Sequence, residues 1–139
     1  MKQAVQDFTI RTNGKGLYEF TAQVESWVLQ QHFTTGLLTL FCQHTSASLL
    51  IQENADPDVQ TDLADYFERA VPERDPHYTH TTEGPDDMPA HIRTALTGVQ
   101  LSIPIIAGRL SLGAWQGLYL FEHRTLPHRR RVAAHILGE

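Results

Sequence analysis

The chain has 139 residues and carries 16 acidic against 11 basic side chains, which gives a formal net charge of −5. This is the length of one ordinary domain, and a hydrophobic share of 41% is typical of a folded protein rather than a disordered one. The acidic balance argues against nucleic-acid binding, and no apolar run approaches the roughly 18–20 residues that a membrane span needs.

The first predicted elements are two short strands and a helix. Residues 4–11 and 17–20 have strand character, and Asn13-Gly14 between them is a strong signal for a β-hairpin. A helix is predicted from Thr21, which can serve as its cap, because the apolar residues that follow recur at helical spacing.

Two buried strands and a second helix come next. The apolar runs 37–42 and 47–51 are compact and have the length of strands. Asp56 is a good helix cap and Pro57 suits the first helical position. The residues behind them give this helix one apolar face, made by Val59, Leu63, Tyr66, Phe67 and Ala70.

Residues 72–87 form the longest irregular stretch, rich in acids, prolines and histidines, and long loops of this kind are often functional. Asp87 is the predicted cap of a third helix, which Gly98 ends. The remainder alternates as β-strands would, most clearly over 115–122 and 132–136. The sequence therefore predicts one α+β domain over residues 1–139, with a mixed or largely antiparallel sheet and three helices.

Histidine is abundant, with eight in the chain. His44 follows a buried strand, His80 lies in the acidic loop, and His91 lies near the start of the third helix. Three neutral imidazoles with one open position make a catalytic zinc-type site, and Mg²⁺ or Mn²⁺ are the alternative ions. Taken singly, each histidine has a structural or surface interpretation, and their spacing alone does not bring them together. The single cysteine, Cys42, has the setting of an inert buried thiol; with an N-terminus that lacks a signal-peptide pattern, it favours a cytoplasmic protein.

Glu53 is the carboxylate with the best case for chemistry, since it directly follows a buried strand. It can act as a general base or as a partner that orients a histidine, and the alternative is a solvated strand end. Asp56 and Asp87 are explained as helix caps.

Two further groups of candidate site residues lie in the C-terminal part of the chain. Trp115 and Gln116 open a strand after a glycine, where they can offer a stacking surface and an orienting amide, or simply a core aromatic and an exposed amide. Arg129, Arg130 and Arg131 form a basic triplet that, with Arg124 and His128, can bind a phosphate through guanidinium groups. The alternative for the triplet is a charged hairpin that protects a strand edge.

Three segments together resemble the YjbQ family, whose members are often labelled secondary thiamine-phosphate synthases: HTSASLLIQENADPDVQTDL, YTHTTEGPDDMPAHI and GRLSLGAWQGLYLFEHR. The resemblance extends from the first predicted strand to the last. It implies a small α+β protein with a barrel- or sandwich-like sheet that assembles as a homotrimer, and an activity that joins a pyrimidine methyl diphosphate to a thiazole phosphate.

The resemblance also implies a set of site residues. The family's clustered histidines, where a metal or an anion can bind, match His44, His80 and His91. The other matching positions are Glu53 and Asn54 in QEN, Asp87 before AHI, and Trp115 and Gln116 in LGAWQ. After Glu122 the chain departs from the family's Asp-Gly-Pro-Arg turn, so a phosphate-binding role for Arg129 does not follow from the resemblance.

Three functional hypotheses follow. The first is a metal-dependent enzyme acting on a small phosphorylated metabolite. It is either a transferase with weak or secondary thiamine-phosphate synthase activity and another physiological substrate, or a hydrolase that uses a metal-bound water. Glu53 then acts as the base or orients a histidine, Trp115 and Gln116 line the pocket, and Arg129 or a neighbour meets a phosphate. Three histidines suit Zn²⁺ better than the Mg²⁺ such a synthase would need, which favours a different main substrate. The second is a homotrimer that binds a metal, an anion or a metabolite without turnover, since the chain has no recognised catalytic signature. In the third, the histidines serve subunit contacts.

Overall fold

The computed structural model describes the whole chain, residues 1–139, and contains two antiparallel sheets and three helices. The larger sheet has the strand order β1-β8-β3-β5-β6. Its strands are β1 (Lys2–Asn13), β8 (Pro127–Gly138), β3 (Thr35–Cys42), β5 (Gln100–Ile106) and β6 (Arg109–Leu110). The smaller sheet is formed by β2 (Gly16–Glu19), β7 (Gln116–Glu122) and β4 (Ala47–Glu53), in that order.

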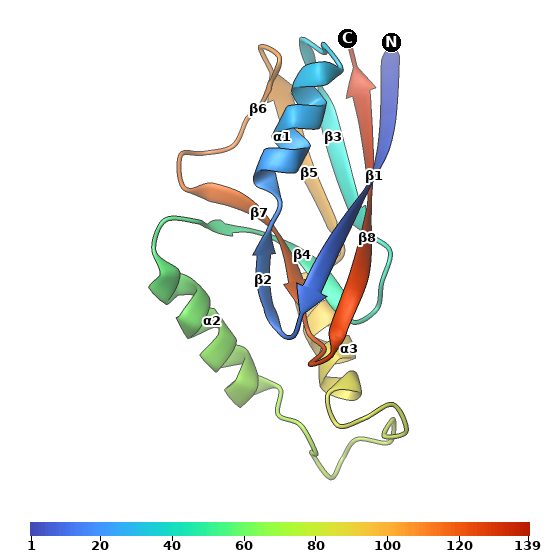
Figure 1. Cartoon of the computed structure of the whole chain (residues 1–139), viewed down its shortest axis with the longest axis vertical. Helices are drawn as coiled ribbons and strands as arrows, with labels where there is room; N and C mark the ends of the chain where they lie inside the picture. The colour runs from blue at the N-terminus through green and yellow to red at the C-terminus, as the bar shows by residue number, and fades with distance from the viewer.

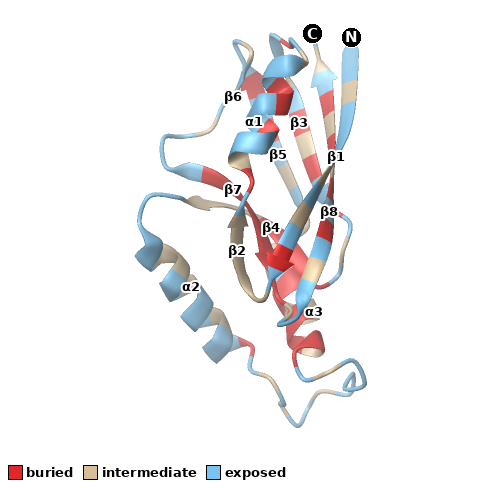
Figure 2. Cartoon of the chain, in the orientation of Figure 1, coloured by how far each residue is buried: buried red, intermediate tan, exposed pale blue.

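The hydrophobic core lies between the two sheets and the first helix, α1 (Thr21–Gln30) (Figure 1). In β3, β5 and β8 alternate residues point inward, so their buried positions appear as separate bands (Figure 2). Strand β7, which is covered on both faces, is instead buried from Gly117 to Glu122. The inner residues of α1 are Val24, Trp27 and Val28. The curled sheets and this helix give the α+β architecture that the sequence predicts.

The other two helices, α2 (Pro57–Ala70) and α3 (Asp87–Thr97), lie on the outer side of the smaller sheet. Asp56 caps α2 as predicted, because its side chain accepts a hydrogen bond of 2.9 Å from the backbone N–H of Asp58, and Pro57 opens the helix. No residue of α2 is buried, and the helix stands away from the body of the molecule (Figures 1 and 2).

Two local predictions for the N-terminal region are wrong. The turn at Asn13-Gly14 does not close a hairpin, because β1 pairs with β8 and β2 pairs with β7. Gly14, at φ 105°, instead turns the chain from one sheet into the other. Thr21 is not the cap of α1: Phe20 holds the cap position, and the Thr21 hydroxyl accepts a hydrogen bond of 2.8 Å from the backbone N–H of Leu118.

The candidate site residues lie at the two opposite ends of the antiparallel pair formed by β4 and β7. Ala47 lies opposite Glu122 at one end, and Glu53 lies opposite Gln116 at the other. The irregular segment 71–86 and the start of α3 are at the first end, drawn at the bottom of Figure 1, and the chain termini are at the top. None of the three helices has both the length and the apolar character required to cross a bilayer.

Candidate functional site

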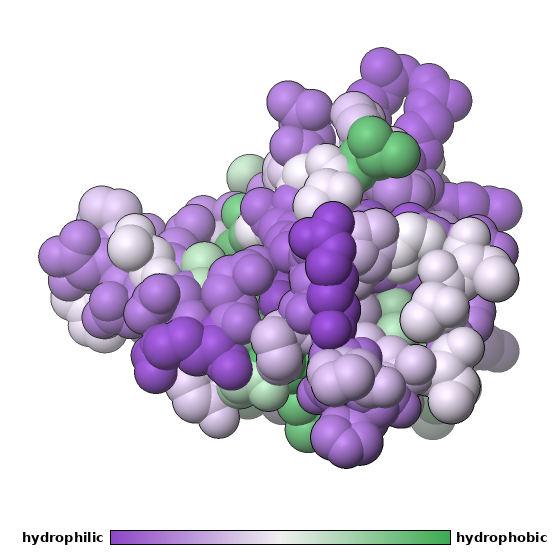
Figure 3. Space-filling view, turned by 90° about the horizontal axis from the view of Figure 1, so that it is seen from below, coloured by the Kyte–Doolittle hydropathy of each residue, from purple (hydrophilic) through white to green (hydrophobic).

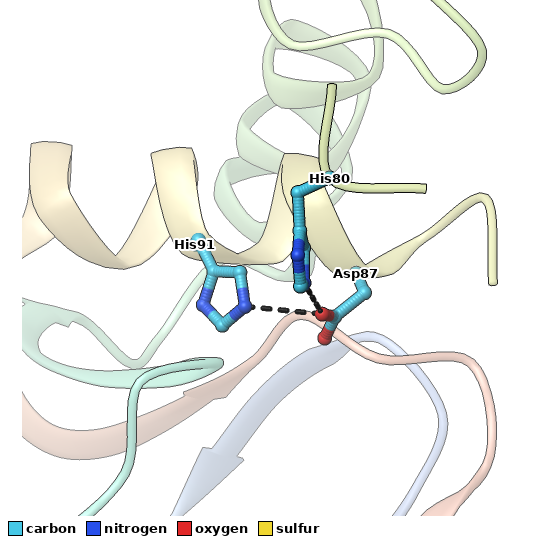
Figure 4. Close-up of side chains that lie close together, drawn as sticks. All are labelled: His80, Asp87 and His91. Carbon is cyan, nitrogen blue, oxygen red and sulfur yellow. Dashed lines mark hydrogen bonds and ion pairs between the residues drawn. The ribbon is translucent and has the colours of Figure 1, made fainter. Parts of the chain in front are cut away.

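Two histidines and one aspartate meet at the first turn of α3 (Figure 4). Asp87 and His91 are four residues apart, so they share one face of the helix, and His80 reaches the same point from the preceding loop. The Oδ2 atom of Asp87 lies 2.7 Å from Nε2 of His80 and 3.0 Å from Nε2 of His91. The carboxylate is buried, with 7% of its side chain exposed, and the two imidazoles are partly open to solvent.

The protonation of His91 is set by the backbone. Its Nδ1 lies 2.9 Å from the carbonyl oxygen of Thr45, and a carbonyl only accepts, so Nδ1 carries a proton. In the neutral ring, Nε2 is then a bare lone pair that faces a carboxylate oxygen. Two acceptors at this distance need a positive charge between them, either a second proton on His91 or a cation. A backbone carbonyl that fixes the tautomer in this way is the usual support of a metal-binding histidine.

Arg124 holds the acidic side of the cluster in place. Its Nη1 donates to Oδ1 of Asp87 at 2.7 Å, its Nε donates to Asp86 at 2.8 Å, and its Nη2 donates to the carbonyl of Glu83. Burial acts to raise the pKa of Asp87, but the hydrogen bond from His80 and the charges of His91 and Arg124 outweigh it and keep this pKa below its ordinary value. Asp87 is therefore ionised at neutral pH, as a metal ligand must be.

Of the three histidines expected to form the metal site, the structure brings together His80 and His91, joined by Asp87, while His44 lies outside this cluster. Its Nε2 accepts a hydrogen bond of 2.8 Å from the backbone N–H of Arg131. The atom that would coordinate an ion is thus already in use. His44 nevertheless lies close by, because it lines the same groove as His91.

Four of the predicted site residues lie at the other end of β4 and β7. Since a strand rises by about 3.3 Å per residue, the seven residues of β4 put Glu53 roughly 20 Å from the His44 end. Asn54 donates to Glu19 at 3.1 Å, Gln116 accepts from the N–H of Gly113, and Trp115 is 64% exposed. Within one chain, these residues do not contact the histidine cluster.

The basic triplet divides between surface and interior. Arg129 is exposed on β8, whereas Arg130 is buried and forms an ion pair with the fully buried Glu122. Arg129 or one of its neighbours was expected to meet a phosphate, and the arginines that lie near the histidines are Arg124 and Arg130. Alternation along β8 is the signal that separates them, since Arg130 shares the inward face with Val132, Ala134 and Ile136.

Two hollows flank the cluster. On the His91 side is an open groove of about 620 Å³, whose walls include Phe41, Cys42, His44, Ala95 and Val99. On the His80 side is a hollow of about 410 Å³ between Arg74, Tyr78, Thr81 and Met88. The surface at this end of the molecule is mainly hydrophilic (Figure 3). A small polar molecule can therefore approach the cluster from either side.

Comparison with known proteins agrees with the resemblance read from the sequence. The model of the family described as "UPF0047 protein YjbQ-like" matches residues 6–139. The chain belongs to the YjbQ family. Among its YjbQ relatives, the UPF0047 protein sll1880 of Synechocystis is 54% identical over 99% of this chain and 94% of its own length. The UPF0047 protein YjbQ of Escherichia coli O157:H7 is 39% identical over 94% of this chain and 95% of its own.

Solved structures of similar chains share the fold. The conserved hypothetical protein TT1486 of Thermus thermophilus has a TM-score of 0.84 and 35% identity, with 95% of this chain and 99% of that chain covered. The hypothetical protein APE1520 of Aeropyrum pernix has a TM-score of 0.89 and 28% identity, with 98% and 99% covered. The same α+β fold is thus found in similar chains from Thermus thermophilus and Aeropyrum pernix.

Proposed function

We propose that this YjbQ-family protein binds a divalent transition metal ion, zinc in the first instance, through Nε2 of His80, Nε2 of His91 and Oδ2 of Asp87. The observation that carries the proposal is the bare lone pair of His91, which the Thr45 carbonyl turns toward an ionised carboxylate. A divalent cation at that point would be held by Nε2 of His91, Oδ2 of Asp87 and Nε2 of His80 together.

The donor set fits such an ion. All three donor atoms lie within 4.8 Å of one another. Their contacts of 2.7 and 3.0 Å are close to the roughly 3.3 Å expected between two ligands of a tetrahedral zinc ion. Two imidazoles and one carboxylate suit Zn²⁺, whereas Mg²⁺ prefers oxygen ligands alone; Mn²⁺ lies between these two.

We further propose that the site acts on a small phosphorylated or otherwise anionic metabolite. A bound ion of this kind supplies Lewis-acid chemistry toward an oxygen of the ligand. The chain's own residues do the rest: Arg124 fixes Asp87, the Thr45 carbonyl fixes His91, and the groove beside His91 offers room for the ligand. With only three protein ligands, a coordination position is left for that oxygen.

The resemblance supports a more specific activity, which is weak or secondary synthesis of thiamine phosphate with release of pyrophosphate. The donor set favours another physiological substrate, because a dedicated synthase would hold two phosphate groups through Mg²⁺ and oxygen ligands. The second candidate is a homotrimer that binds the same ion and ligand without turnover. A cytoplasmic location also belongs to this proposal, and the free, buried thiol of Cys42 supports it.

The test is metal analysis by mass spectrometry on protein purified without a histidine tag. We expect about one zinc-like ion per chain, and its loss in the His80→Ala, Asp87→Asn and His91→Ala variants. His44→Ala is the informative fourth variant, because it keeps the ion if the ligands are His80, Asp87 and His91. His135→Ala is the matched control, since this ring bonds only Gln3 on another strand.

Full occupancy in all three cluster variants would contradict the proposal. A wild-type protein that takes up no Zn²⁺, Mn²⁺ or Mg²⁺ would leave His91 protonated and turn the cluster into an acid–base pair on Asp87. A screen of phosphorylated substrates on the metal-loaded protein then separates the enzyme from the binding protein: turnover that Asp87→Asn abolishes supports the enzyme, and tight binding without turnover supports the second candidate.

A further inference from the structure

His44 has a fixed tautomer, although no metal or carboxylate touches it. The backbone N–H of Arg131 donates to its Nε2 at 2.8 Å, so that nitrogen is unprotonated. A neutral imidazole with a lone pair on Nε2 carries its proton on Nδ1. His44 therefore presents an N–H donor on its other side.

That donor faces a second donor. Nδ1 of His44 lies 3.4 Å from Nη1 of Arg130. A guanidinium nitrogen has no lone pair to offer, so no hydrogen bond joins the two groups. Burial and the charge of Arg130 both lower the pKa of His44, which keeps the ring neutral and leaves this arrangement intact at physiological pH.

The rest of the Arg130 side chain is already committed. Its Nε and Nη2 bind both oxygens of the buried Glu122, and Nη2 also donates to the carbonyl and hydroxyl of Ser46. Among the nitrogens of this guanidinium, Nη1 is the one whose protein contact is only His44. The buried ion pair holds Arg130 rigidly, with only 5% of its side chain exposed, and aims Nη1 at the imidazole.

We propose that Nδ1–H of His44 and Nη1 of Arg130 form an oxyanion subsite, which binds a carboxylate or phosphate oxygen of a small ligand. Two nitrogens 3.4 Å apart can share one oxygen at about 2.9 Å from each. Neighbouring donors whose positions are fixed by other contacts are the usual construction of an oxyanion site.

The position of this subsite ties it to the metal cluster. Thr45 follows His44 directly, and its carbonyl orients His91. His44 and His91 line the same groove, whose other walls are mainly apolar, with Phe41, Ala95 and Val99 among them. The subsite depends on the proposed function only in that the metal ion would be its neighbour. It narrows the ligand to a small molecule that places an apolar part in the groove and an oxyanion at His44.

The experiment is calorimetric titration with inorganic phosphate and, separately, with acetate, on metal-free and zinc-loaded protein. Replacement His44→Phe keeps a ring of similar shape but removes the donor, and we expect it to weaken the preferred anion by about tenfold, the value of one hydrogen bond to a charged group. The His44→Gln variant restores an N–H donor and should recover part of the affinity. The His135→Phe control should bind as the wild type does.

Direct evidence for the tautomer comes from long-range ¹H–¹⁵N spectra of the histidine rings, in which His44 should be protonated at Nδ1 alone. Protonation at Nε2, equal anion affinity in His44→Phe, or no binding of either anion by the wild type would each overturn the subsite. Failure of the metal site looks different: the wild type would take up no ion, yet would still bind an anion in a His44-dependent manner. Whichever anion binds more tightly identifies the ligand group.

Discussion

Asp87 interacts with more charged or titratable groups than any other residue of the candidate site, because two imidazoles share one of its oxygens and Arg124 holds the other. The same guanidinium binds Asp86. Burial acts to raise the pKa of Asp86, but the hydrogen bond from Arg124 outweighs it and lowers this pKa to about 2. Two adjacent carboxylates thus stay ionised with one arginine between them. Two negative carboxylates and one positive guanidinium leave one uncompensated negative charge, which favours a cation or a proton at the imidazoles.

His123 makes the sharpest single-residue prediction, which concerns stability against pH. The ring is buried, and burial together with the charge of Arg93 lowers its pKa to about 3. An unfolded chain takes up this proton as pH falls below about 6.5, but the folded chain does so only near pH 3. The contribution of His123 is thus fully present above pH 6.5 and is lost as pH falls, by at most about 1.4 kcal/mol per pH unit.

We expect His123→Leu to reduce the pH dependence of the free energy of unfolding between pH 6.5 and 4, whatever its effect on stability at neutral pH. Urea titrations at several pH values measure this slope. His135→Leu is the control, because this ring bonds only the uncharged Gln3, and it should keep the wild-type slope. Equal slopes for wild type and His123→Leu would show that this ring takes up its proton as readily in the folded chain.

At the scale of elements, α2 is attached to the rest of the molecule by a few side-chain contacts, since none of its own residues is buried. Phe67 packs edge-on against Phe121 of β7, and Lys15 bridges Glu68 and Glu73. The C-terminal carbonyls of the helix, those of Phe67 and Val71, accept hydrogen bonds from Nη2 of Arg93, a buried residue of α3. A helix attached in this way opens locally before the rest of the fold.

We expect Arg93→Met to speed amide hydrogen exchange in the last two turns of α2 by about 10- to 100-fold, since hydrogen bonds from a charged group contribute about 1.5–3 kcal/mol. Exchange in the sheets should change much less. Arg69→Met is the matched control, because Arg69 is exposed and pairs only with Asp65 within the helix. Equal exchange in both variants would mean that Arg93 does not anchor α2.

The elements also show what sequence can and cannot predict. The cap and proline at Asp56 and Pro57 are local signals, and the structure confirms that helix start. Asn13-Gly14 is an equally local signal, but its outcome depended on strands more than a hundred residues away, because β1 found its partner in β8. The α+β class needed only the alternation of helical and strand patterns.

The candidate site was predictable only in part, for the same reason. His80 and His91 were visible as residues, but Asp87 was predicted to cap α3. That prediction is wrong, because Asp86 holds the cap position and Asp87 is the first residue of the helix. Nothing in its spacing shows that two imidazoles converge on it. Glu53 looked close to His44 because only nine positions separate them. An extended strand between them places them far apart, and Arg124 reaches the site through a pairing of β4 with β7 that no local pattern reveals.

At the scale of the whole molecule, the outer face of the larger sheet is unusually apolar. Leu37 and Leu137 lie opposite each other on β3 and β8, and Val5, Leu37, Phe41 and Leu137 are between 42% and 74% exposed. Apolar patches of this kind mark protein contacts. We propose that this face joins copies of the chain in the homotrimer that the resemblance implies.

We expect Leu37→Arg to shift the molar mass measured by light scattering after size exclusion from that of an oligomer to about 15.7 kDa, the mass of one chain. An arginine in that position would be buried without a partner at the interface. Leu29→Arg is the control, because Leu29 is an exposed leucine on α1 rather than on the sheet. An unchanged mass for Leu37→Arg would exclude this face as the contact.

The place of β8 in the larger sheet has a consequence for biosynthesis. The last strand of the chain lies between β1 and β3, both made much earlier, and pairs with β1 from Lys2–Gly138 to Asn13–Pro127. Until β8 leaves the ribosome, one edge of β1 and one edge of β3 stay open and Glu122 lacks Arg130. The two halves of the larger sheet therefore cannot join before β8 is made, and until then the open edges of β1 and β3 are sites where other chains can pair.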